Sequence, residues 1–166
     1  MLALQILVDG FAISALYALG ATGFTLIFGV SGVLNLSHGA LMVLGAPLST
    51  QAPQSALNFT RAALSAGHQV LRVFFFHDGV HCGNQWLIPP AGQQSIAEQW
   101  AELAQQQKID LVVCVASALK RGVLDDGEAK RYGKSAANLH PAFALSGLGQ
   151  WIDACVNTDR VVTFGG

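Results

Sequence analysis

The sequence predicts an α/β fold: a parallel-type sheet of about five strands flanked by helices, preceded by an apolar helical segment. From Ala40 onward, short apolar runs rich in β-branched and aromatic residues alternate with runs of helical periodicity. Strands that alternate with helices favour a parallel sheet covered on both faces. The 166 residues suffice for one ordinary domain. The first third of the chain differs sharply in composition from the rest.

Residues 1–39 are the apolar segment. No Asp, Glu, Lys or Arg occurs between Asp9 and Arg61. The apolar run from Leu2 to Phe28 is long enough to cross a bilayer, which takes roughly 20 apolar residues. It lacks the basic start and the cleavage site of a signal peptide. We therefore expect a single membrane helix here if the segment is genuine.

The first half of the α/β region contains two strands and two helices. The strands are apolar and bounded by turn residues, whereas the helices carry apolar residues three or four positions apart. A stretch rich in Gly, Asn and Pro predicts a loop between the second strand and the second helix. In chain order these elements are a strand at 41–45, a helix at 54–66, a strand at 69–77, a loop at 78–92 and a helix at 93–107.

The second half follows the same alternation. Its first strand is almost continuously apolar, which is typical of an interior strand. In the last helix, which also carries Trp151, Ile152 and Val156, we expect Cys155 to belong to the core. The predicted elements are a strand at 109–115, short helices at 116–121 and 126–132, a strand at 142–146, a helix at 148–157 and a strand at Arg160–Phe164.

Cys114 is the main candidate for chemistry, because it lies where the apolar strand meets the next helical run. Sites in parallel sheets lie at the carboxyl ends of strands. The start of a helix favours the thiolate, which is the form that attacks sulfur. Spacing alone nevertheless favours a buried structural cysteine, since free cysteines are often buried.

Ordered blocks across residues 40–166 resemble the DsrE/TusD sulfurtransferase family. The blocks are GAP with TQ at 45–51, VFFFHDGV at 73–80, CVASALKRGV at 114–123, and SGLG with DRVV at 146–162. The resemblance implies a DsrE/F-like α/β fold and a sulfurtransferase domain over residues 40–166.

The resemblance also implies that Cys114 is the family's persulfide-carrying cysteine. Lys120 and Arg121 are candidates to support the thiolate or to dock an acidic partner, with a solvated helix end as their alternative interpretation. The implied partners are TusB/TusC-like or DsrF/DsrH-like subunits in a heterohexamer, together with sulfur donor and acceptor proteins.

Three functions follow as hypotheses. The first is a TusD-like sulfur relay subunit for 2-thiouridine synthesis at tRNA wobble positions. The second is a DsrE-like sulfur carrier in cytoplasmic sulfur oxidation, to which residues 125–131 and 138–141 are somewhat closer. The third is a non-catalytic membrane-anchored binding module, which would not need Cys114.

The first 39 residues instead resemble the start of a LivH-type branched-chain amino-acid ABC permease. The matching strings are LQILVDG at 4–10, YAL at 17–19, TLIFGV at 25–30 and NLSHG at 35–39. One or two helices cannot enclose a translocation path, so the resemblance does not imply transport. We expect either a fused reading frame or a genuine membrane tether attached loosely to the α/β domain.

Several other functions are not expected. No P-loop or complete dinucleotide fingerprint is present, so we expect no cofactor. His77, His81 and Cys82 are too few ligands to predict a metal site. A net charge of -1 does not favour direct nucleic-acid binding. Three cysteines without a CxxC pair indicate a reducing compartment, hence a cytoplasmic location, with membrane tethering only if residues 1–39 are genuine.

Overall fold

The computed structural model describes residues 39–43 and 51–165. They lie within the second of the two units into which the chain divides, Leu36–Gly166. The membrane helix expected in residues 1–39 falls outside the described residues, apart from Gly39. Within the described part of the chain, no helix is long and apolar enough to span a bilayer.

Five strands form one sheet. The strands are β1 Gly39–Val43, β2 Val70–Phe75, β3 Asp110–Cys114, β4 Phe143–Ser146 and β5 Arg160–Phe164. Every neighbouring pair is parallel, and the order across the sheet is β4-β3-β2-β1-β5. The predicted parallel sheet is therefore confirmed, with β3 as an interior strand.

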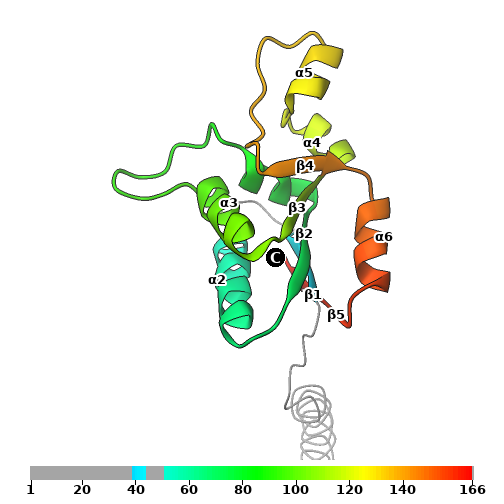
Figure 1. Cartoon of the computed structure of the whole chain (residues 1–166). Coiled ribbons are helices and arrows are strands. Elements are labelled where there is room, and N and C mark those ends of the chain that lie inside the picture. The colour runs from blue at the N-terminus through cyan, green and yellow to red at the C-terminus, as the bar shows by residue number, and fades with distance from the viewer. Residues whose placement is uncertain (1–38, 44–50, 166) are drawn as a thin grey trace, which may run out of the picture. The chain divides into compact units, whose positions relative to one another are not determined.

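Helices cover both faces of this sheet (Figure 1). The long helices α2 Ala52–Ser65 and α3 Ile96–Gln107 lie on one face, and α6 Gly149–Val156 lies on the other. The short helices α4 Val115–Lys120 and α5 Asp126–Arg131 follow the carboxyl end of β3. The sheet thus separates a face with two helices from a face on which α6 lies alone among the described elements.

Several boundaries differ from the sequence prediction. β1 begins at Gly39, two residues early, because Gly39 already pairs with Val70 and Arg160. The predicted loop at 78–92 begins with a 3-10 helix, η1 His77–Gly83, whose Val80 and Cys82 are buried. α3 begins three residues later than predicted, because Ser95 and Glu98 form a capping box that fixes the helix start.

The main core lies between the sheet and the helices α2 and α3. Alternate side chains of β2 and β3 point into it, among them Phe75 and Val113, which are fully buried. Trp100 of α3 is also fully buried and meets Phe75 edge to face, with ring centroids 5.6 Å apart. This apolar contact fixes α3 to the sheet.

The opposite face has a much smaller apolar cluster. It contains Phe74, Val112 and Cys114, with Phe76 and Trp151 packed against them. The prediction that Cys155 belongs to the core is wrong, because Cys155 is only partly buried and belongs to neither cluster. Of its apolar helix neighbours, Ile152 is 62% exposed and Val156 is 78% exposed. The helical pitch turns Trp151 and Ala154 toward the sheet and leaves those two residues outside.

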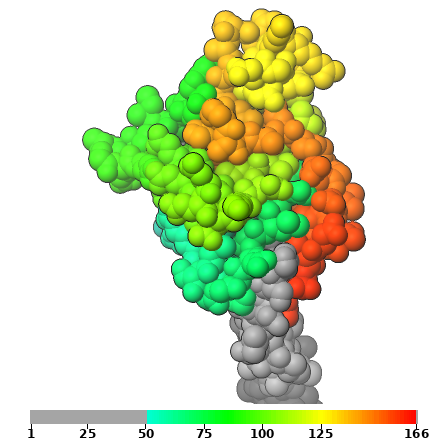
Figure 2. All heavy atoms as spheres, in the orientation of Figure 1, coloured from blue at the N-terminus to red at the C-terminus, as the bar shows by residue number. Residues whose placement is uncertain are grey.

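Two segments project from the body of the domain (Figure 2). The loop between η1 and α3 exposes Trp86 and Ile88, and α5 stands beyond the carboxyl ends of the strands. Asn138 is buried at the base of the α5 projection. Its amide Nδ2 donates to the Gly122 carbonyl at 2.9 Å, and its Oδ1 accepts from the Leu124 N–H at 2.8 Å. These bonds hold the segment after β3 in place.

We expect Trp100→Ala to lower the free energy of unfolding by about 3–5 kcal/mol, because it empties the space between α3 and Phe75. Trp100→Phe should cost clearly less, since it keeps a ring at this position. It also loses no hydrogen bond, because Nε1 of Trp100 has no partner within the described part of the chain. Urea unfolding of the three proteins measures the difference, and equal losses for both variants would contradict this packing role.

Candidate functional site

Cys114 is the last residue of β3 and the N-cap residue of α4. It lies opposite Ser146, the last residue of the neighbouring strand β4. The chain leaves the sheet here because Cys114 keeps an extended backbone while Val115 begins the helix. The cysteine therefore occupies the carboxyl end of an interior parallel strand, as the sequence predicts.

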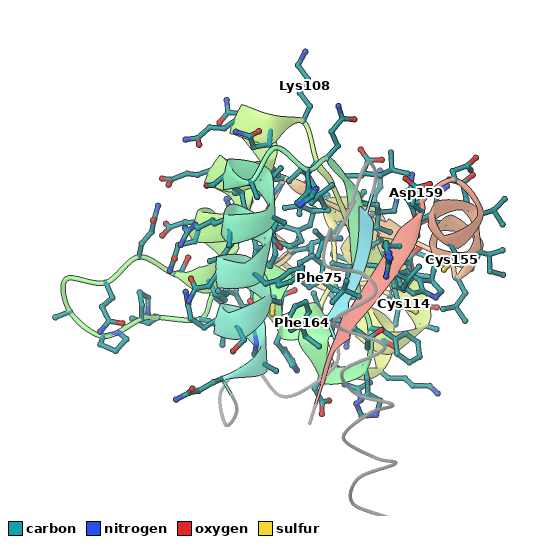
Figure 3. The ribbon with its side chains drawn as sticks, turned by 90° about the horizontal axis from the view of Figure 1, so that it is seen from below. Phe75, Lys108, Cys114, Cys155, Asp159 and Phe164 are labelled. Carbon is teal, nitrogen blue, oxygen red and sulfur yellow. The ribbon has the colours of Figure 1, made fainter. Side chains whose placement is uncertain are left out.

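The side chain of Cys114 lies on the α6 face of the sheet. Phe74 and Val112 share that face, whereas Phe75 points toward α2 and α3 (Figure 3). Cys114 is only 2% exposed. The thiol thus occupies the position of a reactive group while lying under an apolar cover.

Arg121 is engaged in an ion pair across the site. Its Nε donates to Oδ1 of Asp78, in η1 just after β2, over 2.5 Å. This hydrogen bond holds the pKa of the Asp78 carboxyl below its ordinary value, and the positive charge of Arg121 adds to the effect. Lys120 is exposed, and the described residues show no ion pair for it. Of the two cations predicted to support the cysteine, Arg121 is therefore held by Asp78, whereas Lys120 is exposed.

A second contact joins the same two segments. The backbone N–H of His77 donates to Oγ of Ser117, which is buried in α4, over 3.2 Å. His77 has a φ of 51°, in the left-handed region that non-glycine residues seldom adopt. Together with the Asp78–Arg121 pair, this bond ties η1 to the helix that Cys114 begins. Asp78 and Ser117 were not predicted, and only their proximity to the strand ends could have indicated them.

Arg72 forms a polar network on the α6 face that sequence reasoning also missed. Its guanidinium donates to the Gln150 carbonyl at 2.7 Å, to Asp153 at 2.9 Å and to Asp110 at 3.0 Å. The arginine is 8% exposed within strand β2. The signal for it was present in the sequence, since it is the single cation in an otherwise apolar strand.

The other two cysteines have different environments. Cys82 is fully buried in the main core, and burial raises the pKa of its thiol to about 12. Cys155 is partly buried on α6 (Figure 3).

No cluster of three metal-ligating side chains occurs among the described residues. Burial lowers the pKa of His81, and His77 contacts Asp78 at 3.3 Å.

These features define an α/β protein with a single thiol at the carboxyl end of an interior strand. The DsrE/DsrF-like family matches residues 39–164. The chain is 49% identical over 126 residues to DsrE of Allochromatium vinosum, covering 76% of this chain and 97% of that protein. It is 45% identical over 125 residues to the sulfurtransferase TusD of Enterobacter sp., covering 75% of this chain and 98% of that protein.

The chain therefore belongs to the DsrE/DsrF-like family, and the resemblance to the DsrE/TusD sulfurtransferases is confirmed. A solved structure, the YchN protein from E. coli, supports the fold, with a TM-score of 0.59 at 19% identity. The similarity covers 76% of this chain and 99% of YchN. An α/β fold with a parallel sheet flanked by helices is thus common to the two proteins.

We expect the Asp78 carboxyl to titrate below its ordinary value of 3.8 in the native protein. Its stabilising contact with Arg121 is then fully present above 3.8 and is lost as the pH falls through the lower native value. In Arg121→Gln the pKa of Asp78 should return toward 3.8. Carboxyl carbon shifts in an NMR titration report this change, and an unchanged midpoint in the variant would refute the assigned cause.

The Cys82 thiol gives a second pH dependence. The unfolded thiol ionises near 9.0, whereas the buried thiol ionises at about 12. Between these values only the unfolded chain releases the proton, so stability falls as the pH rises from 9.0 toward 12. We expect this loss to approach about 1.4 kcal/mol per pH unit. Denaturant unfolding of wild type and Cys82→Ala isolates it, since the variant should lack this component of the alkaline loss.

Proposed function

We propose that this chain is a sulfurtransferase subunit of a sulfur relay that carries a persulfide on Cys114. The observation that supports the proposal most is the position of Cys114 at the carboxyl end of β3 and at the start of α4. The chain has this thiol within the match to the sulfurtransferase family. The partial positive charge at the start of α4 lies beside any sulfur anion that forms there.

The transfer proceeds in two balanced steps. The Cys114 thiolate attacks the outer sulfur of a donor persulfide, which forms a new S–S bond to Cys114 and breaks the S–S bond of the donor. The electron pair of the broken bond leaves on the donor thiolate. An acceptor cysteine thiolate then attacks the outer sulfur on Cys114 and restores the Cys114 thiolate. No external oxidant or reductant is needed, because each step exchanges one S–S bond for another.

The domain boundaries belong to the same proposal. The sulfurtransferase domain comprises residues 40–166, and residues 1–39 are a permease-like addition.

TusB/TusC-like or DsrF/DsrH-like subunits complete a heterohexamer in the cytoplasm, as the family resemblance implies. Lys120 and Arg121 support the site from the end of α4, Arg121 through its pair with Asp78.

The relay supplies sulfur for 2-thiouridine synthesis at tRNA wobble positions, as in TusD. DsrE-like sulfur oxidation is the second candidate, and the 49% identity to DsrE of Allochromatium vinosum favours it. Gene replacement separates the two functions. Loss of 2-thiouridine from tRNA supports the first, whereas unchanged tRNA together with slowed oxidation of reduced sulfur supports the second.

We expect the reduced protein to gain the mass of one sulfur atom on Cys114 when it is mixed with a persulfidated donor. Cys114→Ser should accept no sulfur, because the attacking atom is absent. Cys155→Ser is the matched control and should accept sulfur as the wild type does. Peptide mass mapping measures the gain. Sulfur acceptance by Cys114→Ser would refute Cys114 as the carrier, whereas a wild type that accepts no sulfur would leave the membrane-anchored binding module as the better hypothesis.

A further inference from the structure

The proposed transfer and the burial of Cys114 impose opposite requirements. A donor persulfide must approach the Cys114 sulfur closely enough to form an S–S bond. At 2% exposure the thiol offers almost no surface to another protein. If the proposed function holds, as this inference requires, some part of the apolar cover must therefore move during each transfer.

Helix α6 is the element that covers this face. Trp151 of α6 packs against the cluster of Phe74, Val112 and Cys114, and its ring centroid lies 5.8 Å from that of Phe74. The other long helices, α2 and α3, lie on the opposite face (Figure 1). Among the described elements, α6 is thus the one whose displacement exposes the Cys114 side of the sheet.

Beyond Trp151, the attachment of α6 is mainly polar. Ala154 is its one buried residue, while Ile152 and Val156 of the helix and Leu148 just before it are exposed. Arg72 supplies a polar anchor through its bonds to the Gln150 carbonyl and to Asp153. A helix with so little buried apolar surface belongs to the class of elements that open locally at low cost.

We propose that α6 is a movable cover over Cys114 and that Arg72, with Gln150 and Asp153, is its latch. In the closed state Trp151 shields the thiol from solvent. In the open state the Arg72 bonds to α6 are broken, Trp151 leaves Phe74, and the sulfur of Cys114 is reachable from the α6 face. The main core, on the other side of the sheet, stays intact throughout.

The test measures how fast N-ethylmaleimide labels Cys114 in the folded full-length chain. A Cys155→Ser background leaves Cys114 and Cys82 as the thiols, and peptide mass mapping reports each separately. Asp153→Asn weakens the latch at a half-exposed side chain, and we expect it to speed Cys114 labelling about two- to fivefold. Trp151→Ala removes the cover, and we expect about a two- to tenfold increase.

Three internal controls keep the result specific. Asp159→Asn removes the same charge from an exposed position beyond α6 and should leave the Cys114 rate unchanged. Asp153→Glu keeps a carboxylate for Arg72 and should restore slow labelling. Cys82 labelling reports opening of the main core, so it should stay slow in every variant. Unchanged Cys114 rates in both Asp153→Asn and Trp151→Ala, or a parallel rise at Cys82, would overturn the proposal.

The labelling assay is independent of sulfur transfer. If Asp153→Asn speeds labelling while wild type accepts no sulfur on Cys114, the cover is supported and the proposed function fails. If Cys114 accepts sulfur while neither Asp153→Asn nor Trp151→Ala changes labelling, the function is supported and the cover fails.

Discussion

The parallel pairing of β3 with β2 and β4 is the constraint on which the rest of the structure depends. An interior strand has both of its backbone edges paired and both of its faces covered. Its chain must therefore leave the sheet at the carboxyl end, where β3 passes directly into α4. Cys114 lies at this carboxyl end, next to the end of β2. The Asp78–Arg121 pair joins η1, which follows β2, to the end of α4, which follows β3. The position of the thiol is thus a consequence of the pairing.

The two faces of the sheet have been assembled from different interactions. On one face, α2 and α3 bury a continuous apolar core that includes Cys82 and Trp100. On the other, a guanidinium in the middle of β2 holds α6 by hydrogen bonds and charge, with one aromatic contact beside it. A thiol on the first face is inert because it is desolvated. Cys114, on the second face, is separated from solvent by a single helix, which suits its proposed role as a sulfur carrier.

The sequence predicted the strand alternation, the five strands and the position of Cys114, because apolar runs and their spacing are local signals. It could not predict which side of α6 meets the sheet, since Trp151, Ile152 and Val156 are equally apolar and only the helix position selects Trp151. It also could not predict the partners of Arg72, because Asp110 and Asp153 lie 38 and 81 positions further along the chain. The 3-10 helix η1 was missed because a Gly- and His-containing stretch has no clear period, although Val80 and Cys82 anchor it in the core.

The asymmetry between the two faces has a consequence for how the domain responds to its solution. Salt screens the charges of Asp110 and Asp153, which are more than half exposed, and so weakens the hold on α6. The core beneath α2 and α3 is insensitive to such screening but loosens on cooling, as apolar burial does. Ionic strength therefore acts mainly on the side of the sheet where Arg72 holds α6. The cover of Cys114 depends on both kinds of interaction, because Trp151 adds an apolar contact to the charged anchor.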